Sequence, residues 1–148
     1  MFIHYGHKKF DISKFQPIRN DRDALYVNKP RGGLWASPLS SACGWKQWCN
    51  TEEYMKYSDD DCFRFKLIAS ARVVKIENLK DYEKLPVMSF DNPFFTHSSF
   101  FALNFEEIAK HYDAIFYKRC DELNYFSPMR AWVCDSLLVL NPDVVVPE

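Results

Sequence analysis

The sequence lacks any apolar run long enough to cross a membrane. No stretch approaches the ~20 consecutive apolar residues of a transmembrane helix. We also expect no secretory leader, because the start from Met1 to Tyr5 is a short apolar run without a basic region ahead of it. These features predict a cytoplasmic protein without a membrane partner.

Closely spaced cysteines are missing as well. The five cysteines are odd in number, and no two of them have the C-x-x-C spacing of common zinc sites. The acidic run from Asp59 to Asp61 lacks the alternating ligands and the glycine of a calcium loop. We therefore expect no metal site and interpret the cysteines as reduced thiols of a cytosolic protein. They are Cys43, Cys49, Cys62, Cys120 and Cys134.

Several common catalytic signatures are absent. The sequence contains no G-x-S-x-G nucleophile elbow, no Walker loop, no H-E-x-x-H and no G-x-G-x-x-G. Its net charge of -1 argues against broad electrostatic capture of nucleic acid. The sequence is instead rich in aromatic residues, at 17%, which supply enough apolar surface to exclude disorder. At 148 residues, we expect a single domain that spans 1–148.

The hydrophobic patterns predict short strands with two or three helices among them. Because these helices interrupt the strands without a regular strand–helix alternation, we expect the α+β class. Helices are expected at 44–55, 78–85 and 105–112, the last with Asn104 as its N-cap. Strands are expected at 2–5, 34–37, 63–68, 71–76, 112–117, 132–140 and 143–146.

Four further expectations concern strand pairing and the segments between the predicted helices and strands. The 71–76 strand should continue or pair with the 63–68 strand. Residues 86–101 should form an ordered loop, and 118–130 a polar connection. A brief strand is possible at Leu25 to Val27.

The stretch from Lys29 to Pro38 (KPRGGLWASP) stands out as a candidate site. Two glycines follow two cationic residues, and a short apolar strand with Trp35 comes directly after them. Glycines let a ligand or another chain approach the backbone closely, so a positive loop before an aromatic strand suits an anionic, flat-ringed ligand. The alternative is an ordinary tight turn into a core strand.

Two titratable residues lie in apolar strand patterns. Asp135 falls inside the 132–140 run, where a carboxylate is rare unless it is paired or functional. Alternatively, Asp135 marks the exposed start of the strand or pairs with Arg130. His4 is either a site residue or a hydrogen-bonded structural histidine. Trp45 and Trp48 share one helix face, a pattern typical of a helix packed on a sheet.

Four short segments occur in a suggestive order. His4 lies in the first strand, which Gly6 ends, and Gly-Gly-Leu-Trp-Ala-Ser over 32–37 leads into and includes the second. A Tyr-Asp-Ala-Ile strand begins at Tyr112, and Cys-Asp-Ser-Leu-Leu-Val-Leu-Asn-Pro begins at Cys134. In this order the segments resemble the ADP-ribosyltransferase superfamily, in particular its H-Y-E branch of poly(ADP-ribose) polymerases and diphtheria-toxin-like enzymes. The resemblance implies split antiparallel β-sheets with NAD as the substrate.

The resemblance also implies roles for individual residues. His4 would hydrogen-bond the ribose and amide of NAD, and Gly6 would let the carboxamide meet the backbone. Trp35 would stack on the nicotinamide, with Ser37 lining the same pocket. Tyr5, Arg31 and Gly33 complete the implied NAD-binding set.

The catalytic carboxylate has more than one candidate. Asp135 would stand near the glutamate of the branch, but Ser136 is at least as well in register with it. Glu122, in the connection before the last long strand, is the reserve candidate. Either Arg31 or Lys29 would hold the pyrophosphate.

These features lead to two functional expectations. The first is NAD-dependent ADP-ribosyl transfer, by a mono-ADP-ribosyltransferase or an NAD glycohydrolase, to a protein, a nucleic acid or water. It needs a stacked nicotinamide and a carboxylate near the developing positive charge, but no metal. The alternative is a catalytically inactive binding module, or an interaction protein of a phage or mobile element. Such a module would contact a partner through the aromatic loops around Phe90, Phe94 and Phe95.

Overall fold

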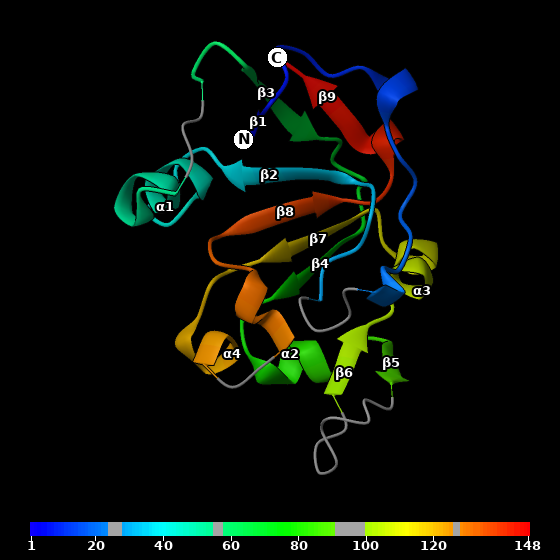
Figure 1. Ribbon diagram of the computed structural model, residues 1–148. Helices are drawn as coiled ribbons and strands as arrows, with labels where there is room; N and C mark the ends of the chain where they lie inside the picture. Colours follow the sequence, from blue (N-terminus) through cyan, green and yellow to red (C-terminus); the bar gives the residue numbers. More distant parts are fainter. Residues whose placement is uncertain (24–27, 55–57, 91–99, 126–127) are drawn as a thin grey trace.

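The computed structural model describes residues 1–23, 28–54, 58–90, 100–125 and 128–148, and it has the α+β class (Figure 1). The strands are β1 Phe2–Tyr5, β2 Leu34–Pro38, β3 Cys62–Leu67, β4 Val73–Ile76, β5 Val87–Phe90, β6 Phe100–Leu103, β7 Ala114–Tyr117, β8 Ser136–Val139 and β9 Val145–Pro147. The helices are α1 Trp45–Glu52, α2 Leu79–Glu83, α3 Phe105–His111 and α4 Asp121–Tyr125, with 3₁₀ turns η1 Ile12–Lys14, η3 Pro128–Ala131 and η4 Pro142–Val144.

Seven strands form one sheet in the order β4-β7-β8-β2-β1-β3-β9, and β5 and β6 form a separate hairpin. The ladders of the large sheet are antiparallel except for β4–β7, which is parallel. Only two residue pairs, Phe2↔Pro38 and Ile3↔Ser37, join β1 to β2. This short ladder divides the sheet into a β4-β7-β8-β2 group and a β1-β3-β9 group. Strands from both ends of the chain therefore share this sheet (Figure 1).

The predicted pairing of 71–76 with 63–68 is wrong. The strand β4 lies at the far edge of the sheet and pairs with β7, while β3 is flanked by β1 and β9. Because both sides of β3 are already hydrogen-bonded, it has no edge left for β4. A parallel pair needs a long crossover, and α2, the β5–β6 hairpin and α3 supply it here.

Other boundaries also differ from the expectations. The ordered loop expected at 86–101 contains β5 and the start of β6, and the polar connection at 118–130 contains α4 and most of η3. The last long strand begins at Ser136 rather than at residue 132, so Asp135 precedes it. The brief strand expected at Leu25 to Val27 lies outside the described residues, as do Phe94 and Phe95 and the side chain of Phe90.

The burial of β8 on both faces explains the apolar run from Leu137 to Val139. All four of its residues are buried, because Leu138 packs into one apolar cluster while Leu137 and Val139 pack into another on the opposite face. Side chains alternate between the faces of a strand, so a strand covered on both faces is apolar throughout. β2 pairs with this buried strand, and the pairing fixes the position of β2 in the sheet.

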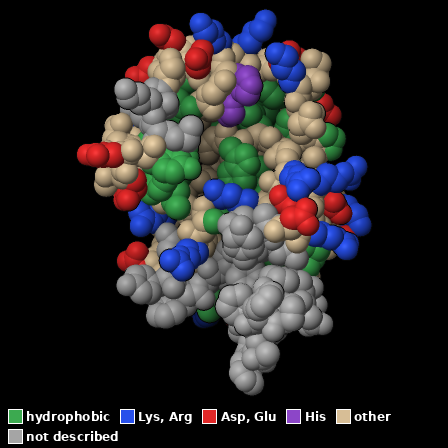
Figure 2. All heavy atoms as spheres, in the orientation of Figure 1, with side chains coloured by type: hydrophobic (Ala, Val, Ile, Leu, Met, Phe, Trp, Pro, Cys, Tyr) green, Lys and Arg blue, Asp and Glu red, His purple; other side chains and the backbone are tan. Residues whose placement is uncertain are grey.

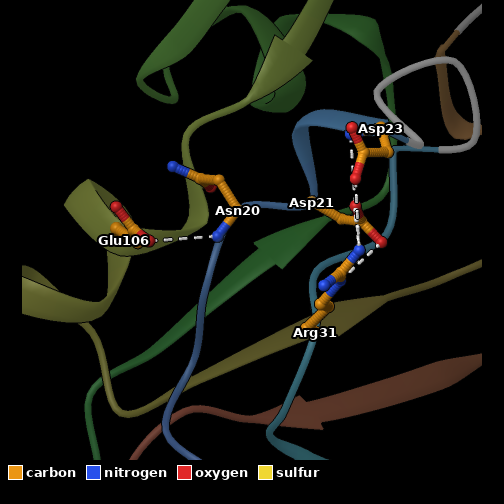
Figure 3. Close-up of polar contacts among 5 residues, drawn as sticks. All are labelled: Asn20, Asp21, Asp23, Arg31 and Glu106. Carbon is orange, nitrogen blue, oxygen red and sulfur yellow. Dashed lines mark hydrogen bonds and ion pairs between the residues drawn. The ribbon is translucent and has the colours of Figure 1, made fainter.

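The predicted N-cap of the third helix is confirmed. The Asn104 side chain accepts a hydrogen bond from the backbone N–H of Glu107, and acidic residues occupy the first turn of α3. Asn20 fastens the N-terminal segment to the same helix end, since its side chain bonds Asn104 and the N–H of Phe105. The N–H of Asn20 also donates to the carboxylate of Glu106 (Figure 3).

No helix in the described part of the chain has the length and apolar character needed to cross a membrane.

Candidate functional site

A cavity of about 390 Å³ opens among β1, β2, the start of α1 and the segment before β8. This volume lies within the range of about 300–1,000 Å³ typical of small-molecule sites. Figure 2 shows a hollowed face with hydrophobic side chains in the hollow and histidine and cationic side chains near its edge. The walls are mainly aromatic and aliphatic, and the polar groups are few. The lining residues are Ile3, His4, Tyr5, Gly6, Lys29, Trp35, Ala36, Ser37, Trp45, Trp132, Val133, Cys134 and Ser136.

His4 is held in one orientation by two hydrogen bonds. Its Nδ1 lies 2.7 Å from the carbonyl oxygen of Trp35, and its Nε2 lies 3.0 Å from Nδ1 of His7. A carbonyl oxygen only accepts, so Nδ1 of His4 carries the proton and donates it. Burial lowers the pKa of His4, against the opposing effect of the Trp35 carbonyl. In the neutral ring, Nε2 is then the acceptor, and it faces His7.

The Trp35 ring lies against the cavity and is only partly buried. Trp132 meets it edge-on with ring centroids 4.7 Å apart, and the Lys29 ammonium lies 5.5 Å from its centroid. Edge-to-face pairing and a cation over an indole are both favourable aromatic contacts. Trp35 therefore has the exposure to a cavity that a stacking residue needs.

Asn28 holds Trp132, one of the residues that line the cavity, in place. Asn28 is 1% exposed and has a φ of 50°, and its carbonyl oxygen accepts a hydrogen bond of 2.8 Å from Nε1 of Trp132. Its side-chain oxygen accepts from the N–H of Leu103 at 2.7 Å. The left-handed backbone conformation tolerates asparagine better than most residues, which explains this residue type at the turn. Asn28 thereby links β6 to Trp132 and sets the path of the chain into Lys29.

The hydroxyl and thiol groups of the cavity are already engaged within the fold. Ser37 Oγ accepts from the N–H of Trp45 at 2.9 Å and so satisfies the first turn of α1. Ser136 Oγ donates to the carbonyl of Cys134 at 2.8 Å. Burial raises the pKa of the Cys134 thiol, which therefore favours its neutral form. None of these groups is set up as an activated nucleophile.

Asp135 does not line the cavity. Its carboxylate accepts a 2.6 Å hydrogen bond from Ser41 Oγ and a 2.9 Å bond from the N–H of Arg119. The catalytic role that the resemblance implies for Asp135 requires it to lie in the same pocket as His4 and Trp35, so this expectation is wrong for Asp135. The contacts with Ser41 and Arg119 also replace the alternative pairing with Arg130. The reason is the strand boundary, because Ser136 is the first residue of β8 and is the one that faces the cavity.

Glu122 does not reach the cavity either. Its carboxylate accepts from the N–H of Leu79, the first residue of α2. Carboxylates are favourable at helix N-termini, so this contact has a structural explanation. Among the described lining residues the cavity thus contains no carboxylate.

Arg31 and Gly33 also lie outside the cavity lining. Arg31 is exposed and binds Asp21 with an N–O distance of 3.0 Å and Asp23 at 3.5 Å (Figure 3). Gly33 has a φ of 73°, and an added Cβ would lie 2.7 Å from Leu138 Cδ1. Gly33 is therefore needed for close packing on β8, and Lys29, not Arg31, is the cation that faces the cavity.

A second cavity of about 500 Å³ shares His4 and Trp35 with the first. It is distinguished by its basic groups, since Lys8, Lys9 and Lys14 line it together with His7, against the one carboxylate of Asp11 among the described lining residues. Gly33 also lines this cavity. Lys8 and Lys14 make long ion pairs of 3.9 Å, with Asp61 and Asp11, and both ammonium groups stay exposed. Such exposed pairs are weak, so this cavity offers positive charge to an anionic ligand.

Several cavity residues have no role in the site expected from the sequence, among them Trp45, Trp132 and Cys134. Trp45 was interpreted as packing α1 on a sheet, but its ring stacks on Trp48 with centroids 5.3 Å apart and lines the cavity. Trp132 and Cys134 were assigned to a strand interior. The signal available in the sequence was the high tryptophan content itself, because tryptophan is enriched in binding surfaces.

No cluster of three or more metal-ligating side chains occurs among the residues that the structure describes. Comparison with family models, with curated proteins and with solved structures finds no match to this chain.

Proposed function

We propose that the chain binds NAD and transfers its ADP-ribose to an acceptor. The observation that carries this proposal is the shared wall of the two cavities. An apolar, aromatic cavity and a basic cavity meet at His4 and Trp35. A ligand with a flat ring at one end and phosphates at the other matches this division, and NAD has that form.

The strand order supports the proposal. Three of the four segments on which the resemblance to ADP-ribosyltransferases rests form β1, β2 and β8, which are neighbours in the sheet. His4 and Trp35 come from the first two, and the cavity-facing residue of the third is Ser136. This arrangement favours Ser136 over Asp135 as the residue in register with the glutamate of the H-Y-E branch.

The reaction requires cleavage of the bond between ribose C1′ and the nicotinamide nitrogen. The electron pair of that bond goes to the ring nitrogen, and an acceptor oxygen then bonds C1′ and releases its proton to solvent. In this proposal Trp35 and Trp132 confine the ring, and Nε2 of His4 meets a ribose hydroxyl in place of His7. Ser136 Oγ offers a neutral dipole where the branch has a carboxylate, which predicts slow turnover.

The proposal is tested by incubating the purified chain with NAD and measuring nicotinamide release, with NAD binding measured by calorimetry. Trp35→Ala and Ser136→Ala should lower nicotinamide release by about tenfold or more, equivalent to about 1.4 kcal/mol. Asp135→Asn and Arg31→Gln serve as controls and should change it less than about twofold. Absence of both binding and release in the wild-type chain would reject the proposal.

The second candidate is a catalytically inactive module that binds the same ligand. The lack of a carboxylate among the described residues that line the cavity favours it. This candidate predicts NAD binding that Trp35→Ala weakens, with no nicotinamide release above the buffer control. A release rate that falls in the cavity variants and not in the controls would exclude it.

A further inference from the structure

Lys29 is the cationic side chain of the aromatic cavity. It is partly buried, lines the cavity and lies over Trp35 at 5.5 Å from the ring centroid. The ordinary reason for a lysine in such a place is an ion pair with a nearby acid. Among the described residues, no carboxylate forms a salt bridge with Lys29, and none lines the cavity with it.

The other titratable groups of the cavity do not neutralise this charge. The thiol of Cys134 has a raised pKa, and His4 has a lowered pKa, so both favour their uncharged forms. Lys29 is itself partly buried, and this burial lowers the pKa of its ammonium group. Charges interact more strongly where aromatic walls replace water. A charged ring that enters the cavity therefore interacts strongly with the Lys29 ammonium.

We propose that Lys29 repels the positively charged pyridinium ring of NAD and thereby favours departure of the nicotinamide. This inference rests on the proposed function, because it concerns the ring end of the same ligand. The ring carries its positive charge only while it is bonded to C1′. When that bond breaks, its electron pair goes to the ring nitrogen and the ring becomes neutral, so the repulsion at the ring ends.

The positive charge does not disappear but moves from the ring to the ribose. There an acceptor oxygen captures C1′ and gives its proton to solvent, which balances the reaction. Lys29 thus destabilises the bound substrate more than the transition state. Destabilisation of this kind raises KM and kcat together, whereas uniform binding lowers KM without raising kcat.

The binding half of the inference is tested by comparing NAD with NADH, whose ring is neutral. Calorimetry on the wild-type chain should show NADH bound about tenfold more tightly than NAD, because only NAD has a charged ring. In Lys29→Met the two ligands should bind within about twofold of each other, while Lys29→Arg retains the preference. Lys14→Met, in the other cavity, is the matched control and should lower both affinities without changing their ratio.

The kinetic half is tested by nicotinamide release. Lys29→Met should lower KM and kcat for NAD by several-fold each, the pattern expected when ground-state strain is removed. A structural role for Lys29 would instead weaken binding of both ligands, and Lys29→Arg would not rescue it. Thermal melts of each variant separate this case from a general loss of folding.

Each outcome bears on a different claim. Equal affinity for the two ligands in the wild-type chain, with NAD turnover present, overturns the role of Lys29 and leaves the proposed function standing. No binding of either ligand overturns both. Preferred binding of NADH without any turnover supports the repulsion and overturns its catalytic effect.

Discussion

The imidazole of His4 donates from Nδ1 to the carbonyl oxygen of Trp35, at 2.7 Å, across the junction between β1 and β2. Only two residue pairs join these strands, so the side chain extends a ladder that the backbone leaves short. The same bond orients the His4 ring at the wall shared by the two cavities. The bond between His4 and the Trp35 carbonyl therefore contributes both to the stability of the junction and to the shape of the site.

His4→Ala should lower both the stability of the junction between β1 and β2 and the affinity of the site for NAD. Loss of one hydrogen bond between His4 and Trp35 should lower the free energy of unfolding by about 1 kcal/mol. The affinity for NAD should fall at the same time. Urea denaturation and calorimetry measure the two effects. His7→Ala is the matched control, because it removes only the exposed bond between the two histidines and leaves the Nδ1 bond intact, so it should lower stability less than His4→Ala.

The pH dependence of His4 has a definite sign. Its pKa in the folded chain is lowered below the model-compound value of 6.5, so the unfolded chain binds the proton more readily. The contribution of His4 to stability is therefore complete above pH 6.5 and is lost as the pH falls through the folded pKa. His4→Gln should flatten this part of the stability curve. An unchanged curve in His4→Gln would contradict the assignment of a neutral His4.

The turn at Asn28 gives a test of how the Trp132 wall is supported. Asn28→Ala leaves the buried N–H of Leu103 without its partner and forces alanine into a φ of 50°. Together these effects should cost about 3 kcal/mol in urea denaturation. Asn28→Gly relieves the backbone strain but not the lost hydrogen bond, so it should be about 1 kcal/mol more stable than Asn28→Ala. Equal stabilities would show that the left-handed conformation is not a constraint.

Gly33 is expected to act through close packing on its neighbours, although it also lines the second cavity. An added Cβ would lie 2.7 Å from Leu138 and 2.8 Å from Ile18, at a φ of 73°. Gly33→Ala should therefore cost about 3 kcal/mol of unfolding free energy. Gly44→Ala is the control, since its φ is ordinary and its closest neighbour is the flexible end of Gln47, 3.0 Å away. It should cost less than about 1 kcal/mol.

The sequence patterns predicted the α+β class, most strands and the capped helix α3, because these depend on local periodicity and capping chemistry. They failed where the outcome depends on distant partners. The position of β4 at the sheet edge is decided by β1 and β9, which occupy both sides of β3. The sequence of residues 71–76 gives no indication that both sides of β3 are already paired.

In the candidate site, too, some residues lie where the sequence pattern places them and others do not. His4, Trp35 and Ser37 lie where a strand-based interpretation places them, because neighbouring strands bring their side chains together. Asp135 was misplaced because an apolar run does not reveal where its hydrogen-bonded portion begins. A one-residue difference at that boundary exchanges the cavity-facing residue, and Ser136 takes the place expected for Asp135.

The ion pair between the buried Asp113 and the exposed Arg72 provides a last prediction on stability. The Asp113 carboxylate accepts hydrogen bonds from the side chain and N–H of Arg72 and from Asn141. The Arg72 side chain is the main cause that lowers the pKa of Asp113 to about 2. The folded pKa lies below the ordinary value of 3.8, so this contribution is complete above pH 3.8 and is lost as the pH falls towards 2.

Asp113→Asn removes the charge and should lower the free energy of unfolding by about 2 kcal/mol at neutral pH. The difference from the wild type should shrink as the pH falls from 4 to 2, because the wild-type carboxylate becomes protonated there. Urea denaturation at several pH values measures this convergence. Asp143→Asn is a suitable control, since Asp143 is exposed and lies close by on η4. A constant difference between Asp113→Asn and wild type across this range would show that the Arg72 contact does not act through charge.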